Sequence, residues 1–138
     1  CIMIETTLQI ILKSIPNIDL YNWKIIYING TSQADFNMIE FENIVNNSMK
    51  GYFISSSELI ELSEKIIYLI DIDIIGDFKL SKLDNIKQEI YDFKISLIDS
   101  SYWEIYSSNP IFLEKWLDNK DVRIKHYFGN ASEVLLKI

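Results

Sequence analysis

The most pronounced hydrophobic pattern in the chain lies at Lys65–Phe78, KIIYLIDIDIIGDF. An unbroken apolar and aromatic run at 66–70 is followed by aspartates that alternate with isoleucines up to a Gly-Asp turn. A short apolar run rich in β-branched residues and bounded by turn residues is typical of a strand buried on both faces. We therefore predict a central strand near 66–74, which delivers the carboxylates of Asp71 and Asp73 to the rim of a sheet.

Helical patterns recur on both sides of this strand. Apolar residues repeat at helical spacing between Leu8 and Ile15, after a threonine that can cap the first turn. Ser55 and Glu58 form a capping box, and Asn109 followed by proline is a typical helix start. The sequence thus predicts helices at 8–15, 55–65, 81–90 and 110–117.

Extended patterns account for much of the remaining chain. A first strand is expected to end at the turn signal Asn29-Gly30, and two later strands flank the short turn at Asp99–Ser101 and should pair as a hairpin. The last of the predicted strands below alternates basic and apolar residues, as on a half-exposed strand or an edge strand. Residues 31–50 fit neither period, so short strands, a loop and a helix all stay open there. The predicted strands are Trp23–Ile28, Lys94–Ile98, Tyr102–Tyr106 and Val122–Phe128.

These elements fit one globular domain over residues 1–138, a length that can bury a core. Strands alternate with helices, but a hairpin near 94–106 interrupts the alternation. We predict an α/β or α+β fold, in which about four helices cover a mixed sheet whose central strand lies near 66–74. In the α+β alternative, all helices lie on one face.

The composition of the chain limits the kinds of molecule that the protein can be expected to bind. The net charge of −7 and the pI near 4.6 argue against binding to nucleic acid or to an anionic membrane, since both need clustered basic residues. Cys1 is the only cysteine, so no disulfide can form within the chain, which agrees with a reducing compartment. The N-terminal residues have no signal-peptide pattern. We expect a cytoplasmic protein.

Aspartates at the end of the central strand form the first candidate site. Residues two apart in a strand project to the same face, so Asp71 and Asp73 could hold a hard divalent cation together. Asp77 in the following turn is the third candidate ligand, and Glu89 or Asp99 could join from elsewhere. Such a cluster would suit metal-dependent phosphoryl chemistry. The alternative is that these carboxylates are simply hydrated.

Other catalytic arrangements are missing from the sequence. His126, the sole histidine, has no triad around it, and Ser100 and Ser101 lack the glycines of a nucleophile elbow. The four glycines are too far apart to form a phosphate-binding loop. We therefore expect no cofactor and no enzyme, with carboxylate-only chemistry as the one route left open.

The second candidate site is the aromatic strand YWEIY at 102–106. If Trp103 and Ile105 point inward, alternation places two tyrosines around a carboxylate on the outer face. Rigid aromatic rings beside an acidic group are favoured on protein-recognition surfaces. The alternative is that a helix covers both tyrosines. The candidate partner-binding residues are Tyr102, Glu104, Tyr106 and the turn residue Asp99.

The order of several segments resembles a known family. YNWKIIYING is followed by SSSELIEL, YLIDIDIIGDF, IYDF and ISLIDSSYWEIYSSN, over about Tyr21 to Asn119. This order resembles an uncharacterised family of small Bacillus-type proteins, classified as a domain of unknown function. The resemblance implies a single bacterial cytoplasmic domain and supplies no catalytic residues. The acidic, isoleucine-rich character is also similar to that of immunity proteins, which neutralise secreted toxins.

Together these observations favour a non-catalytic protein-binding module with a basic protein partner, and an immunity-type role is its most concrete form. Complementary charge would then speed association with the partner. The alternative is a metal-dependent hydrolase that uses the aspartates. A third hypothesis is self-association through the predicted edge strand Val122–Phe128. The carboxylates expected to face a basic toxin are those of Asp71, Asp73, Asp99 and Glu104.

Overall fold

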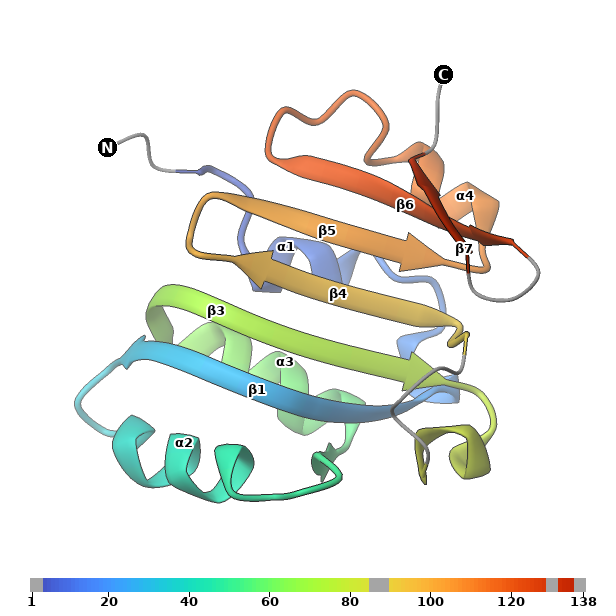
Figure 1. Cartoon of the computed structure of the whole chain (residues 1–138). Helices are drawn as coiled ribbons and strands as arrows, with labels where there is room; N and C mark the ends of the chain where they lie inside the picture. Colours follow the sequence, from blue (N-terminus) through green and yellow to red (C-terminus); the bar gives the residue numbers. More distant parts are fainter. Residues whose placement is uncertain (1–3, 85–89, 129–131, 136–138) are drawn as a thin grey trace.

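The computed structural model describes residues 4–84, 90–128 and 132–135 (Figure 1). The strands in this part of the chain form a seven-stranded sheet with the order β2-β1-β3-β4-β5-β6-β7. Neighbouring strands are antiparallel except β5 and β6, which are parallel. The helices are α1 (Leu8–Lys13), α2 (Met38–Asn46), α3 (Ser56–Lys65) and α4 (Pro110–Glu114), with the 3-10 turns η1 (Ile18–Leu20) and η2 (Leu80–Asp84). The strands are β1 (Asn22–Ser32), β2 (Tyr52–Ile54), β3 (Ile66–Asp77), β4 (Phe93–Ile98), β5 (Tyr102–Ser107), β6 (Val122–Phe128) and β7 (Ser132–Leu135).

The predicted mixed sheet with covering helices is confirmed. Its inner face packs against α1, α3 and α4, and Figure 1 shows α1 and α3 behind the sheet. The cap signals act as predicted, since the side chains of Thr7, Ser55 and Asn109 accept backbone N–H bonds at the starts of these helices. The predominantly antiparallel pairing, with these helices on one face, is closer to the α+β alternative. The core includes Leu12, Trp23, Ile25, Leu59, Ile74, Ile95, Trp103 and Phe112.

The first half of β3 differs from the prediction. Residues 66–70 are extended, but Ile67 is 69% exposed and Tyr68 is 43% exposed, so this run is not buried on both faces. The reason is pairing, because β4 is in register only with Ile72–Gly76 and the earlier residues of β3 pair with β1 alone. The buried half of β3 is the half in which aspartates alternate with isoleucines.

Three other elements differ from the sequence predictions, and the stretch that the sequence left open is resolved. Asn29 and Gly30 lie inside β1 and make no turn, and the ambiguous stretch 31–50 contains the helix α2. Within the predicted helix 81–90 the described residues form only the end of η2, although Leu83 is buried as expected, and 85–89 lie outside the described residues. The strand β6 pairs with β5 and with β7, so it is not the edge of the sheet.

Helix α2 closes an exposed strand edge. Beside the short β2, the outer edge of β1 continues, and there the side-chain amide of Asn46 bonds to both the N–H (3.1 Å) and the C=O (3.0 Å) of Ile28. The carboxylate of Glu42 accepts the N–H of Gly30 at 2.7 Å. These side chains occupy backbone groups that another strand would otherwise pair with.

Replacing Asn46 by alanine is therefore expected to lower the free energy of unfolding by about 1–2 kcal/mol, since two hydrogen bonds to β1 are lost. It should also promote self-association through the freed edge. Denaturant unfolding and light scattering measure the two effects. Asn43→Ala, on the same helix, is the matched control. An equal loss of stability in both variants would contradict this role of Asn46.

Candidate functional site: the outer face of the sheet

Most of the residues selected from the sequence lie on the outer face of the sheet, which Figure 1 presents to the viewer. The strand register places Tyr27 beside Asp73, Asp73 beside Ser96, Ser96 beside Glu104, and Glu104 beside Arg123. Cross-strand partners share a face. These five side chains therefore form one row across β1, β3, β4, β5 and β6, and no helix of the described part of the chain lies over it in Figure 1.

The carboxylates of Asp71 and Asp73 both point to this face, as predicted, and each has a partner. The Oδ1 atom of Asp73 accepts the hydroxyl of Ser96 at 2.7 Å. The Oδ1 atom of Asp71 accepts the backbone N–H of Asp99 at 2.9 Å, which ties the β4–β5 hairpin to β3. Both side chains are half-buried. They give the β3 side of the face its negative charge.

The β5 side of the same face carries both signs of charge. The guanidinium of Arg123 lies 3.7 Å from the ring centroid of Tyr102, a cation–π contact. The ammonium of Lys125 lies 3.0 Å from the carboxylate of Glu104. Glu104 therefore already has an ion-pair partner. The aromatic ring on this side of the face is that of Tyr102, which is covered by the guanidinium of Arg123.

The other two predicted partner-binding residues have different environments. Asp99 is exposed at the tip of the hairpin, with φ at 48°. Tyr106 lies on the outer side of β5, as alternation places it, but it is only 9% exposed, so the alternative of a covered tyrosine holds at this position. Burial raises the pKa of its phenol, and the charge of Asp92 raises it further.

Asp77 is the last residue of β3, and its carboxylate stabilises the chain that follows instead of joining the other two aspartates. Its carboxylate accepts the backbone N–H of Lys79 (2.8 Å) and of Asp92 (3.0 Å). Among the described residues no group of three acidic, histidine or cysteine side chains is placed to hold a metal ion. The structure thus does not assemble the predicted set of Asp71, Asp73 and Asp77. Glu89 and the side chain of His126 lie outside what the structure describes.

One end of the outer face is covered. Leu83 of η2 and Tyr91 pack with Ile75 in a second, smaller core. Lys24 is buried on the same face and donates from Nζ to the C=O of Leu83 at 2.6 Å. Burial lowers the pKa of Lys24, while the charge of Asp84 raises it in part. This lysine fastens η2 to the sheet.

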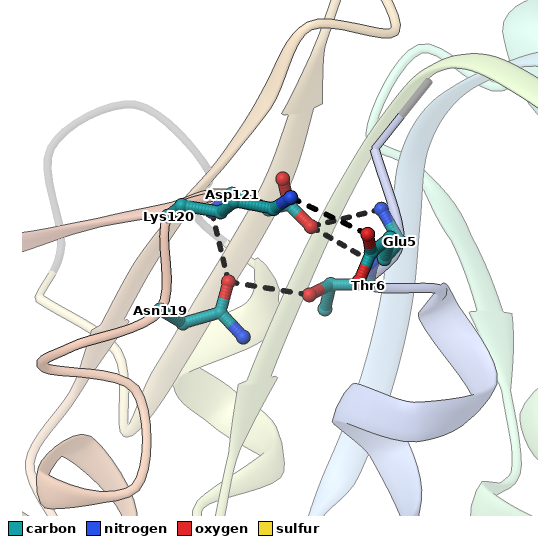
Figure 2. Close-up of polar contacts among 5 residues, drawn as sticks. All are labelled: Glu5, Thr6, Asn119, Lys120 and Asp121. Atoms are coloured by element: carbon teal, nitrogen blue, oxygen red, sulfur yellow. Dashed lines mark hydrogen bonds and ion pairs between the residues drawn. The ribbon is translucent and has the colours of Figure 1, made fainter. Parts of the chain in front are cut away.

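At the opposite side of the molecule, Asp121 holds the N-terminal segment, as Figure 2 shows. Its Oδ2 atom accepts the backbone N–H groups of Glu5 (2.9 Å) and Thr6 (3.0 Å). The hydroxyl of Thr6 donates to Asn119, and Lys120 forms an ion pair with Glu5 at 3.3 Å. We call this group the N-terminal clasp. It joins the start of the chain to the turn before β6.

An apolar pocket of about 170 Å³ lies between this N-terminal segment and the start of β3. Its walls come from residues 4–8 and 66–69, with Leu97 and Trp103 of the hairpin. The phenol of Tyr68 donates to the hydroxyl of Ser100 at 3.1 Å, so these two polar groups pair with each other at its rim. The lining of the pocket is mainly apolar. It does not present the oriented polar groups that a catalytic site needs.

Sequence reasoning missed Tyr27 and Arg123. Strict alternation in the strand 23–28 places Tyr27 on the inner face with Trp23 and Ile25. A β-bulge between Ile25 and Tyr27 shifts the register, and Tyr27 is consequently 44% exposed on the outer face. Arg123 carried a signal, as the only arginine of the chain, but its stacking on Tyr102 depends on the parallel pairing of β5 and β6.

The fold and this face define a protein built on a mixed, mostly antiparallel sheet, with helices packed on one side and charged and aromatic side chains on the other. A scan against protein-family models finds no match for the chain, and searches of curated proteins and of solved structures find no significant match. Within the described ranges, no helix is both long and apolar enough to cross a membrane.

Proposed function

We propose that this protein is a non-catalytic protein-binding module of a bacterial cytoplasm and that it binds its partner through the outer face of the sheet. The observation that supports this proposal is the row from Tyr27 to Arg123. It combines exposed tyrosine and arginine side chains with carboxylates on neighbouring rigid strands. Tyrosine and arginine are enriched among the residues that dominate the energy of protein interfaces.

The chemistry of the face indicates the kind of partner. Asp71 and Asp73 contribute negative charge on the β3 side, and the whole chain has a net charge of −7. A basic protein would be steered toward such a surface, so its association rate should fall as salt concentration rises. An immunity-type role, in which the partner is a basic secreted toxin, is the concrete form of this proposal. The resemblance to the uncharacterised Bacillus-type family supports the same bacterial setting.

Site-specific photocrosslinking in bacterial cells tests the proposal. A photoreactive phenylalanine analogue at position 27 should crosslink to a protein partner. The same analogue in place of Ile111, which is exposed on α4, should not. With that partner in hand, Tyr27→Ala and Arg123→Ala should each weaken binding about tenfold by calorimetry, because they remove an aromatic or arginine anchor.

Ile111→Ala is the matched control, as it also removes a large exposed side chain. Its affinity for the partner should equal that of the unaltered protein. Equal crosslinking at positions 27 and 111, or unchanged affinity after both sheet-face substitutions, would refute the outer face as the binding surface.

A further inference from the structure

A groove of about 300 Å³ opens on another side of the molecule, between α2, β2 and α3. Three aromatic rings line it. Those of Phe36 and Phe41 have their centroids 5.6 Å apart, and Phe41 meets Tyr52 edge-on at the same distance. All three side chains are half-buried, so each ring packs against the core and still presents surface to the groove.

The α3 wall of this groove is acidic. Glu58 and Glu61 both line it. One carboxylate oxygen of Glu58 closes the capping box with Ser55. Glu61 is exposed and makes no hydrogen bond or ion pair with the described residues, so its carboxylate is available to a ligand.

The one basic residue that lines the groove is already neutralised. Lys65 forms an ion pair with Asp35 at 2.8 Å. This hydrogen bond and the charge of Asp35 raise the pKa of Lys65, and the same partnership lowers the pKa of Asp35. Asp35 and the two glutamates place three carboxylates in the groove and at its rim, whereas Lys65 supplies one ammonium group. The groove thus carries net negative charge above aromatic rings.

We propose that this groove binds an arginine side chain of a protein partner. The faces of aromatic rings attract cations, and carboxylates at the rim pair with the same charge. A guanidinium suits this arrangement better than an ammonium does, because it is planar, stacks on rings and can bond to a carboxylate through two N–H groups. The groove lies at the β2 edge, apart from the sheet-face row. The inference thus goes beyond the proposed function and can fail without affecting it.

Titration by two-dimensional NMR with the peptide acetyl-Gly-Arg-Gly-amide tests this site. The aromatic resonances of Phe41 and Tyr52 should shift in a saturable way. The lysine counterpart should bind several-fold more weakly, and the uncharged citrulline counterpart should leave both resonances in place. Glu61→Gln should weaken binding of the arginine peptide about fivefold, as expected for one exposed ion pair.

Glu64→Gln is the matched control, since it removes the same charge from the same helix on the side that faces Lys13. It should leave the affinity for the arginine peptide unchanged, and unchanged chemical-shift dispersion will show that both variants are folded. Three results would overturn the proposal. They are no shift at tens of millimolar peptide, equal binding of the citrulline or lysine peptide, and equal weakening by Glu61→Gln and Glu64→Gln.

Discussion

Replacing Gly76 by alanine is expected to destabilise the protein by about 2–3 kcal/mol. A Cβ atom at this position in β3 would lie 2.4 Å from Cζ3 and 2.6 Å from Cε3 of the Trp23 ring. The indole has little room to move, because it is buried and packs against Tyr21 and Phe93. At most other strand positions the same substitution would be favourable or neutral, since glycine costs backbone entropy.

A double-mutant cycle separates this steric effect from any general effect on β3. Trp23→Phe removes the ring atoms that collide with the new methyl group, at its own cost in core packing. In that background, Gly76→Ala should cost less than about 1 kcal/mol, so the coupling energy should be large. Denaturant unfolding of the four proteins measures it. Additive effects would show that Gly76 is required for a reason other than the indole.

Removing the carboxylate of the N-terminal clasp should have a comparable effect. Asp121→Ala leaves the N–H groups of Glu5 and Thr6 without an acceptor at a position where Asp121 is only 7% exposed. Hydrogen bonds to a charged group contribute about 1.5–3 kcal/mol each, and part of this is recovered by water at Glu5. We expect a loss of about 2–3 kcal/mol in the free energy of unfolding. Asp118→Ala, three residues earlier and exposed, is the matched control.

From the N-terminal clasp we also predict how the stability of the protein changes at acid pH. Burial raises the pKa of Asp121, but the backbone N–H bonds from Thr6 and Glu5 outweigh it, so its pKa lies below the ordinary 3.8. A carboxyl with a lowered pKa in the folded state stabilises the protein above its unfolded-state pKa, and that stability is lost as pH falls through the folded value. The stability difference between the native protein and Asp121→Asn should therefore be constant near neutral pH and shrink below pH 3.8. A difference that stays constant down to pH 2 would contradict the shift.

The direction of the side chains on β5 could be predicted from the sequence, but their exposure could not. Alternation alone places Trp103 and Ile105 inside, and both are buried in the structure. It also places Tyr102 and Tyr106 on one outer face, but it says nothing about what covers that face. Asp92, in the segment that leads to β4, lies close enough to Tyr106 for its charge to raise the pKa of the phenol, while Tyr102 lies under Arg123. The residues that lie over this face come from distant parts of the sequence. The local pattern of β5 therefore could not show that the two tyrosines differ in exposure.

Several local elements follow from the sequence alone, because caps, turns and periodicity act over a few neighbouring residues. Ser55 with Glu58, Asn109 before proline, and the hairpin around Asp99 all appear as their local chemistry predicts. The strand order, the burial of each half of β3 and the bulge that exposes Tyr27 become visible only in the folded chain. These features depend on which strands pair and for how many residues. Which strands pair depends on the packing contacts of the whole core. The sequence of one segment does not contain that information.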